Sequence, residues 1–374
     1  MLIGVPKEIK NHEYRVGITP AGVQELIEQG HEVLIEHLAG DAIGLTDELY
    51  RQAGATIIDS AKTIYDKAEL IVKVKEPQPK EWQWLKTGQI LFAYLHLAAD
   101  KQQTQDLLDS GATCIAYETV TDKHGGLPLL APMSEIAGKL SILMGCRALE
   151  NSQGGKGILL GGVPGVASAK VIILGGGAVG EQAARMAIGL GADTTIFDIN
   201  VSRLRQLDAH FGPLLKTQFA SQDNIEHAIQ SANLIVGAVL IPGAAAPKLL
   251  TKGMLTTMKP ASVLVDVAID QGGCFETSKP TSHDNPTYKE QGIIHYCVTN
   301  MPGAVAQTAT YALTNVTLPY IKSLANKGLK QALSEDEYLR EGLTIHNNKV
   351  THKAVATAHQ YRYYSFENLD LSPG

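Results

Sequence analysis

Short apolar runs alternate with amphipathic stretches along the first third of the chain. The runs are Leu2–Val5, Val33–His37, Thr56–Ile58, Leu70–Lys75, Ile90–Leu95 and Thr113–Glu118. The stretches between them have a helical period, as in the segment that begins at Thr19-Pro20 and ends at Gly30. Proline just inside a helix start and glycine just past its end are typical of helix boundaries. Apolar strands that alternate with such helices predict βαβ units and a parallel sheet.

A second alternation begins after Pro132, with a helix-like stretch at 134–150 and a glycine-rich link at 154–165. Further strands are predicted at Val171–Leu174, Thr194–Phe197, Leu234–Ala238, Ser262–Val267 and Ile293–Val298. From about Gln307 a long apolar pattern predicts a helix, and an aromatic tail follows Gln360. The predicted fold class is therefore α/β, with two doubly wound, Rossmann-like domains whose sheets are mostly parallel.

Composition agrees with two globular domains and excludes several classes of protein. The 374 residues are 44% hydrophobic and 19% charged, and 32 basic against 38 acidic residues leave a net charge of -6. A chain without a basic excess is not expected to bind nucleic acid or an anionic membrane surface. No apolar run reaches the ~18–20 residues of a membrane span, and the start lacks the pattern of a secretory signal. The four cysteines are far apart, which predicts reduced thiols in a cytoplasmic protein and no zinc site.

A glycine motif follows the first strand of the second alternation. Gly175, Gly177 and Gly180 fit G-x-G-x-x-G between a predicted strand and a predicted helix, and Asp198 ends the next strand. Such glycines allow a tight turn and a close approach of the backbone to a pyrophosphate at the helix start. An acid at the second strand end can bind an adenosine ribose and repels a 2′-phosphate, which favours NAD over NADP. Arg203 weakens that preference, because an arginine can accept a 2′-phosphate.

Polar residues also follow the other predicted strands, where ligands of open α/β sheets bind. They are Arg15, Lys75, His96, Glu118, Asp270 and Asn300, the last of which is followed by the apolar Met301. A set of cations, an imidazole and carboxylates at one sheet edge is typical of an active site that faces a dinucleotide.

Four of these residues also have an interpretation without function, and Glu118 has one as a supporting residue. Lys75 could be a solvated strand end, and His96 a buried histidine that is held by hydrogen bonds. Arg15 could form a surface ion pair with Glu13. Asp270 could cap the turn that follows it, and Glu118 could orient a basic residue.

Several longer motifs resemble the alanine dehydrogenase family along almost the whole chain. They are Gly4-Val5-Pro6-Lys7-Glu8 with Glu13-Tyr14-Arg15-Val16, Val72-Lys73-Val74-Lys75-Glu76-Pro77, Tyr94-Leu95-His96-Leu97-Ala98, Leu159–Gly165, Asp266–Gly273 and Asn300-Met301-Pro302-Gly303. The resemblance implies reversible oxidation of L-alanine by NAD to pyruvate, ammonium and NADH in a cytoplasmic homohexamer. It also implies a discontinuous substrate domain, 1–128 with 307–374, and an NAD-binding Rossmann domain, 129–306.

The resemblance assigns roles to residues of this chain. Arg15 and Lys75 would bind the carboxylate and carbonyl side of the substrate, His96 and Asp270 would carry out the acid–base steps, and Glu118 would support them. Cofactor contacts would come from the glycine motif and from Ser134, Ala178, Val179, Asp198, Arg203, Val239, Leu240, Val267, Ala268, Ile269, Asp270, Val298, Asn300 and Met301. No metal is implied. A histidine suits this chemistry because its ordinary pKa lies near neutrality.

Three other functions share parts of this pattern. The soluble NAD-binding subunit of a proton-translocating transhydrogenase has the same architecture, but it would leave Arg15, Lys75 and His96 without a small substrate. Saccharopine dehydrogenase is a related enzyme of lysine metabolism. A non-catalytic NAD-binding module would need only the nucleotide fold. For a catalytic function, we also expect both sheets to turn their carboxyl ends toward one shared cleft.

Overall fold

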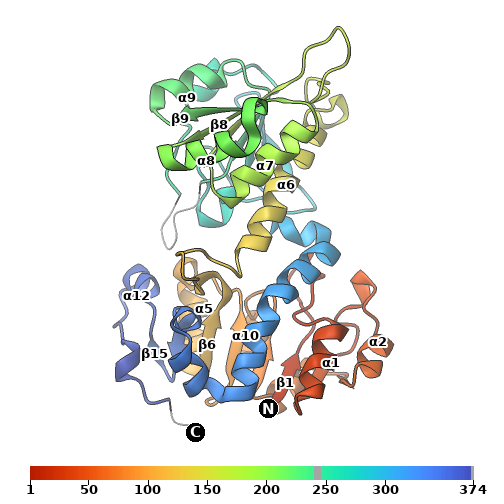
Figure 1. Ribbon diagram of the computed structural model, residues 1–374, viewed down its shortest axis with the longest axis vertical. Helices are drawn as coiled ribbons and strands as arrows, with labels where there is room; N and C mark the ends of the chain where they lie inside the picture. The colour runs from red at the N-terminus through yellow and green to blue at the C-terminus, as the bar shows by residue number, and fades with distance from the viewer. Residues whose placement is uncertain (240–245, 372–374) are drawn as a thin grey trace. The chain divides into compact units, whose positions relative to one another are not determined.

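The computed structural model describes residues 1–239 and 246–371. The chain divides into two compact units, which Figure 1 shows in ribbon form. Unit 1 consists of Met1–Met133 together with Val305–Gly374, and unit 2 consists of Ser134–Ala304. The two ends of the chain therefore belong to the same unit.

The sheet of unit 1 has eight strands in the order β15-β14-β6-β5-β4-β1-β2-β3. The first six strands of the chain pair in parallel, and the C-terminal hairpin adds two antiparallel strands beyond β6. These strands are β1 (Leu2–Val5), β2 (Glu32–Glu36), β3 (Thr56–Ile58), β4 (Leu70–Val72), β5 (Ile90–Ala93), β6 (Thr113–Ala116), β14 (Leu343–His346) and β15 (Lys349–Val350).

The helices of unit 1 lie between and after these strands. They are α1 (Pro20–Glu28), α2 (Asp47–Gln52), α3 (Ala61–Lys67), α4 (Pro79–Trp82), α5 (Lys101–Ser110), α10 (Ala306–Glu335), α11 (Glu337–Arg340) and α12 (Lys353–His359). Helix α1 begins as predicted, with Pro20 in its first turn and the Thr19 hydroxyl accepting from Gly22 N at 3.4 Å. Helix α10 is interrupted at Gly328, whose φ of 73° lies in the left-handed region, a feature that the apolar pattern did not indicate.

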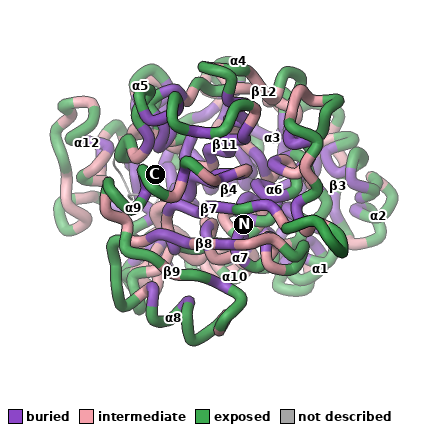
Figure 2. The backbone as a smooth tube through the Cα atoms, turned by 90° about the horizontal axis from the view of Figure 1, so that it is seen from above, coloured by how far each residue is buried: buried purple, intermediate pink, exposed green. Residues whose placement is uncertain are grey.

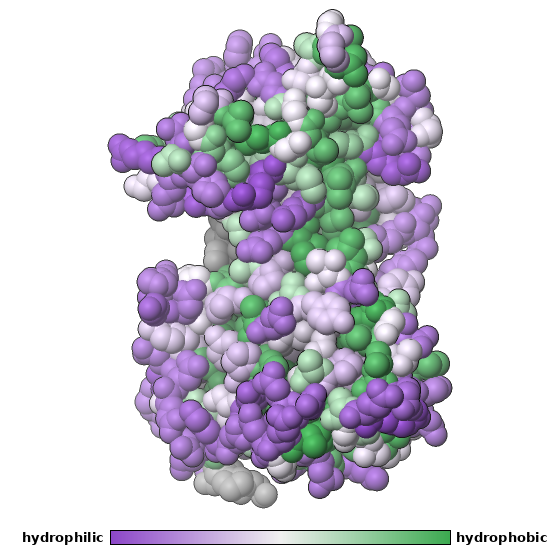
Figure 3. Space-filling model, turned by 45° about the vertical axis from the view of Figure 1, so that its right-hand side comes forward, coloured by the Kyte–Doolittle hydropathy of each residue, from purple (hydrophilic) through white to green (hydrophobic). Residues whose placement is uncertain are grey.

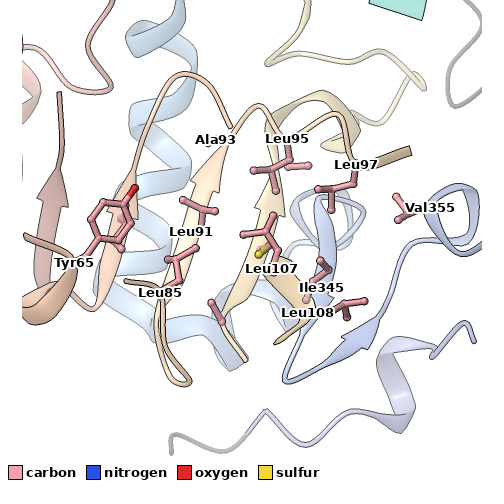
Figure 4. Close-up of a cluster of buried hydrophobic side chains, with 14 of the residues drawn as sticks. Tyr65, Leu85, Leu91, Ala93, Leu95, Leu97, Leu107, Leu108, Ile345 and Val355 are labelled. Carbon is pink, nitrogen blue, oxygen red and sulfur yellow. The ribbon is translucent and has the colours of Figure 1, made fainter. Parts of the chain in front are cut away.

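A cluster of buried side chains fills the space between the sheet of unit 1 and the elements on one of its faces. Figure 4 shows Leu91 and Ala93 of β5 beside Leu95, with Leu107 and Ile345 nearby. Ile345 belongs to β14, so the C-terminal part of the chain supplies part of the core that the first 133 residues begin. Burial of this apolar surface stabilises the unit.

The sheet of unit 2 has seven strands in the order β12-β13-β11-β10-β7-β8-β9. All neighbours pair in parallel except β12 and β13. The strands are β7 (Lys170–Leu174), β8 (Asp193–Asp198), β9 (Leu215–Phe219), β10 (Leu234–Gly237), β11 (Val263–Asp266), β12 (Thr287–Glu290) and β13 (Ile293–Tyr296). Its helices include α7 (Ala178–Gly189), α8 (Val201–Phe211) and α9 (Gln222–Ile229). Helix α6 (Ala131–Ala148) begins in unit 1 and belongs to unit 2 from Ser134 onward.

Each sheet has one topological switch point, at the strand where the chain reverses the direction in which it adds strands. In unit 1 the switch lies between β1 and β4, and in unit 2 it lies between β7 and β10. The predicted fold class, two doubly wound α/β sheets, is thereby confirmed. Ligands of such sheets bind outside the carboxyl ends of the strands at the switch point.

Four strands, β9, β12, β14 and β15, were missed by the sequence patterns. Strands β9 and β12 are edge strands that carry polar residues, and β9 has the sequence Leu-Lys-Thr-Gln-Phe with most side chains partly or fully exposed. A strand that packs on only part of one face does not need a continuous apolar run. In Figure 2 the labelled strands β4, β7 and β11 are mostly buried, whereas α8 and α9 carry much exposed surface.

Two surface features complete the description. The glycine-rich link and the residue after it contain Leu159, Val163 and Val166, which are 68%, 54% and 64% exposed. Figure 3 shows that apolar side chains reach the surface of the molecule in this view. The aromatic tail lies on unit 1, because Tyr364 N donates to Val350 O at 2.9 Å.

Within residues 1–239 and 246–371, no helix combines the length and the hydropathy needed to cross a membrane.

Candidate active site

The loop after β1 contains a buried ion pair. Arg15 Nε donates to Glu13 Oε1 at 2.7 Å and its Nη2 donates to Oε2 at 2.5 Å, while Nη1 lies 3.1 Å from Met133 Sδ. The ion pair with Glu13 is therefore present, but Arg15 is only 2% exposed, so the prediction that the pair lies on the surface is wrong. Burial opposes the charge of the guanidinium, but the Glu13 carboxylate outweighs this effect and raises the pKa of Arg15. Arg15 is therefore a permanent cation beside the switch point of unit 1.

Lys75 follows β4, the strand on the other side of that switch point. It is 7% exposed, so the alternative of a solvated strand end is wrong. Its Nζ lies 3.9 Å from Glu76 Oε2, and its backbone N donates to Glu8 Oε1 at 3.3 Å. Burial would raise the pKa of Glu76, but the nearby charges of Lys75 and Lys10 lower it, which keeps this carboxyl ionised.

Two residues before Lys75 lies a second group of buried charges, which the sequence patterns did not indicate. Lys73 Nζ donates to Glu8 Oε2 at 3.1 Å and to Glu81 Oε1 at 3.0 Å, and the Tyr65 hydroxyl also donates to Glu81 Oε1, at 3.0 Å. Burial raises the pKa of Glu8 to about 7, although Lys73 acts in the opposite direction. The signal in the sequence is Lys73 itself, a lysine that directly continues the apolar run of β4.

His96 follows β5 and has an unusual backbone conformation. Its φ of 51° and ψ of 37° are left-handed, a conformation that non-glycine residues seldom adopt. The carboxylate of Glu118, which follows β6, accepts from His96 N at 2.6 Å and from Leu95 N at 3.2 Å. The ring is half-buried and lies parallel to the Tyr94 ring, 6.1 Å away between centroids. No described residue hydrogen bonds to that ring, so the fully buried, hydrogen-bonded histidine considered for this position is wrong.

Unit 1 therefore places Arg15, Lys75 and His96 after β1, β4 and β5, which are neighbours in the sheet. Two cations can hold a carboxylate and polarise a carbonyl oxygen, and a half-buried imidazole can exchange protons. Glu118 supports the backbone of His96 rather than its ring. Such a group of side chains suits a small 2-oxo or 2-amino acid.

The glycine motif of unit 2 lies between β7 and α7, at the switch point of that sheet. A Cβ at Gly180 would lie 1.8 Å from Gly175 O, and one at Gly175 would lie 2.7 Å from Ala238 O, so both positions require glycine. A Cβ at Gly177 would meet no atom within 4 Å; this residue is exposed, and no described side chain caps the start of α7 there. An uncapped helix start beside an open glycine fits the pyrophosphate of a dinucleotide.

Asp198, at the end of β8, is bound to the glycine loop. Its Oδ2 accepts from Gly176 N at 2.6 Å and its Oδ1 accepts from Asn200 N at 2.7 Å. A carboxylate can accept about four hydrogen bonds, so these two leave capacity for ribose hydroxyls. Arg203 is also close, with its Nε donating to Gly176 O at 2.6 Å.

Asp270 lies in the 3₁₀ helix η7 (Val267–Gln271), directly after β11, and is exposed. The structure gives it no role in the turn that follows it. Instead Asp266 holds this segment, because its buried carboxylate accepts from Ala268 N at 3.0 Å and from Cys274 N at 2.9 Å. The cap considered for Asp270 therefore belongs to Asp266, which was not singled out from the sequence although it ends an apolar strand.

The remaining predicted cofactor contacts are spread over several elements of unit 2. Asn300 follows β13 with a φ of 60°, and Val298 and Met301 beside it are buried. Val267 is half-buried, and Ala268 and Ile269 are buried in η7. Ala178 and Val179 begin α7, Ser134 lies in α6, and Val239 follows β10. Leu240 lies outside the described residues. In the described part of the chain, no three His, Cys, Asp or Glu side chains are grouped as a metal site, and the four cysteines are free.

Comparison with known protein families gives two matches that together span nearly the whole chain. Residues 4–137 match the alanine dehydrogenase/PNT N-terminal domain, and residues 141–353 match the alanine dehydrogenase/PNT C-terminal domain.

Individual relatives agree with these matches. The chain is 56% identical over 369 residues to an alanine dehydrogenase of Halomonas elongata, covering 99% of this chain and 100% of that protein. A solved structure of an L-alanine dehydrogenase superposes with a TM-score of 0.92 at 52% identity, covering 96% of this chain and 99% of the other. A transhydrogenase structure from Sinorhizobium meliloti superposes with a TM-score of 0.81 at 22% identity, covering 94% of this chain and 100% of the other, which shows a shared fold.

Proposed function

The chain belongs to the alanine dehydrogenase/PNT family, and from this premise we propose that it catalyses the reversible oxidative deamination of L-alanine with NAD. The balanced reaction converts L-alanine, NAD⁺ and water to pyruvate, ammonium, NADH and a proton. The observation that carries the proposal is the presence of Arg15, Lys75 and His96 at adjacent strand ends of unit 1. Neither a transhydrogenase subunit nor a non-catalytic module needs these groups for a small substrate.

A nicotinamide dinucleotide is the cofactor of this family, and NAD is the form that we propose for this chain. The residues that would hold it are the glycines between β7 and α7, Asp198 and the segments after β10, β11 and β13. When it is bound, its nicotinamide ring accepts a hydride from the Cα of the substrate. The support for NAD over NADP is Asp198, whose negative charge would oppose a 2′-phosphate.

We propose that Arg15 and Lys75 hold the substrate. The Nε–Nη2 edge of Arg15 is bound to Glu13, which fixes the orientation of the guanidinium that would attract the substrate carboxylate. Lys75 would stabilise the negative charge that develops on the carbonyl oxygen of pyruvate during reductive amination. Because both cations are buried, their charges are little screened by solvent.

We assign the proton transfers to His96 and Asp270. Cα can release a hydride only when the substrate nitrogen is a neutral amine, because its electron pair must form the iminium. Water then adds to the iminium, and the resulting carbinolamine loses ammonia to give the ketone. A base and an acid are needed at each stage, and an imidazole or an exposed carboxylate can fill these roles.

The direct test is the formation of NADH, followed by its ultraviolet absorbance, with purified protein, NAD and a panel of amino acids. We expect activity with L-alanine above that with other amino acids, and the reverse reaction with pyruvate, ammonium and NADH. Hydride exchange between dinucleotides without any amino acid would instead favour the transhydrogenase function. The homohexamer and the cytoplasmic location remain predictions, and light scattering of the purified protein tests the first of them.

A further inference from the structure

Arg203 of α8 is held by three groups, one in the glycine loop, one in α7 and one in its own helix. Its Nε donates to Gly176 O at 2.6 Å, its Nη1 donates to Gln206 Oε1 at 3.2 Å, and its Nη2 forms an ion pair with Glu181 Oε2. Glu181 lies in the first turn of α7. The Arg203 and Glu181 side chains are 27% and 25% exposed, so the pair is only partly open to solvent.

This arrangement bears on the choice between NAD and NADP. An arginine shortly after the acid of a second Rossmann strand is the type of residue that accepts a 2′-phosphate, and a guanidinium binds phosphate through paired hydrogen bonds. Here one N–H group on each of the three guanidinium nitrogens already has a partner, so three of the five N–H donors are engaged. A 2′-phosphate that pairs with the guanidinium would have to share Nη2 with the Glu181 carboxylate, whose charge opposes that of the phosphate.

We propose that Glu181 is a second determinant of cofactor specificity, which acts by holding Arg203 away from the 2′-phosphate of NADP. This inference rests on the proposed function, because it concerns the same dinucleotide site. Asp198 opposes the 2′-phosphate directly, through its charge, and Glu181 opposes it indirectly, by occupying the cation that would otherwise neutralise that charge. The two carboxylates therefore act on the same phosphate by separate routes.

A purely structural role of Glu181 predicts a different result. An acidic residue in the first turn of a helix is stabilised by the helix dipole, and Glu181 Oε1 also lies 3.9 Å from Arg185 Nη2. Loss of such a role would weaken NAD and NADP binding alike, or lower the thermal stability. Loss of the specificity role changes the ratio of the two dissociation constants.

The experiment measures the binding of NAD and of NADP to the full chain by isothermal titration calorimetry, which needs no turnover. The variants are Asp198→Gly, Glu181→Gln, the double variant, and the triple variant that adds Arg203→Ala. Glu226→Gln, an exposed glutamate of α9 in the same unit, is the matched control. NAD-dependent oxidation of L-alanine by the unaltered protein is measured in parallel.

We expect Asp198→Gly to improve NADP binding relative to NAD, and the double variant to improve it further by on the order of tenfold, the scale of one charge-assisted hydrogen bond. Adding Arg203→Ala should abolish that further gain, and Glu226→Gln should leave the ratio unchanged. The inference is overturned if the double variant has the same NADP-to-NAD ratio as Asp198→Gly, or if Arg203→Ala leaves the gain intact. If the unaltered protein binds neither dinucleotide, both the proposed function and this inference fail. If it oxidises L-alanine with NAD but the double variant has the same ratio of NADP to NAD dissociation constants as Asp198→Gly, only this inference fails.

Discussion

Carboxylates that hold backbone N–H groups recur at the strand ends of both units. Glu8 binds the backbone that carries Lys75, and Glu118 binds the backbone of His96. Asp266 does the same for the segment that contains Asp270. Lys75, His96 and Asp270, to which we assign roles, therefore each lie in a segment whose backbone is held by a carboxylate side chain. Such support reduces the freedom of groups that must meet a substrate in one geometry.

The acid–base assignments predict large effects of two substitutions. His96→Ala and Asp270→Asn should each lower kcat by more than about 100-fold, the usual scale for a group that transfers protons. Steady-state kinetics of L-alanine oxidation measure the effect, and His227→Ala, which removes an exposed histidine of α9, is the control. A near-normal kcat in both variants would contradict the assignments.

The buried Glu8 carboxyl predicts a pH-dependent stability. Its pKa is raised by burial from 4.5 to about 7, so the folded protein binds a proton that the unfolded chain has already released in this range. The free energy of unfolding should therefore decrease as the pH rises from about 4.5 to 7, by up to about 3 kcal/mol. Urea unfolding at a series of pH values measures this slope.

The isosteric variant Glu8→Gln cannot titrate, so it should remove this part of the slope. Glu48→Gln, on the surface of α2, should leave the slope as it is. An identical pH dependence in Glu8→Gln and the unaltered protein would show that Glu8 is not the titrating group.

At the scale of elements, the glycine loop between strand β7 and helix α7 contains both crowded and open positions. The two glycines Gly180 and Gly177 share a motif but differ in their surroundings. Gly180 lies against backbone, whereas Gly177 faces open space with a φ of -69° that any residue can adopt. Packing requires glycine at position 180, whereas at position 177 only the proposed dinucleotide would require it.

This difference predicts separable effects of two alanine substitutions. Gly180→Ala should destabilise the protein by about 2 kcal/mol or more, since its Cβ would meet Gly175 O at 1.8 Å. Gly177→Ala should leave the thermal stability nearly unchanged but weaken NAD binding, because the methyl group would stand where the pyrophosphate approaches. Thermal unfolding and calorimetric titration of both variants measure the two effects. Normal NAD binding by Gly177→Ala would argue against the proposed position of the pyrophosphate.

For the whole molecule, the important feature is that one unit is continuous in sequence and the other is not. Unit 2 contains all seven strands of its sheet within Ser134–Ala304. Unit 1 needs Val305–Gly374, because β14 pairs with β6 and Ile345 lies in its core. Without this segment, the edge of β6 and part of the apolar core would be exposed to solvent.

The two units should therefore behave differently when they are expressed as fragments. Residues 134–304 should fold cooperatively and bind NAD, whereas residues 1–133 should not give a cooperative unfolding transition by themselves. Circular dichroism of both fragments during thermal unfolding, and NAD titration of residues 134–304, measure this. Cooperative folding of residues 1–133 would show that the C-terminal segment is dispensable for unit 1.

The periodicity of apolar residues and the spacing of glycines determined most of the secondary structure and the doubly wound fold. Both are local properties of the chain: a buried parallel strand is apolar along its length, and Gly180 has no room for a side chain. The edge strands β9 and β12 were not predictable in this way, because half-exposed strands tolerate polar residues.

The tertiary structure decided which polar residues are buried and what they contact. Lys75 at 7% exposure and Arg15 at 2% look like surface residues in the sequence, and only the packing of distant segments removes them from water. The same holds for Glu8 with Lys73, which are far apart in the chain, and packing also brings Glu181 to Arg203, although that pair stays partly open to solvent. The shared cleft expected from the sequence stays a prediction. The sequence determines the charge and the hydrogen-bonding groups of each residue. The fold determines how far those groups are buried, and burial sets the strength of their electrostatic interactions.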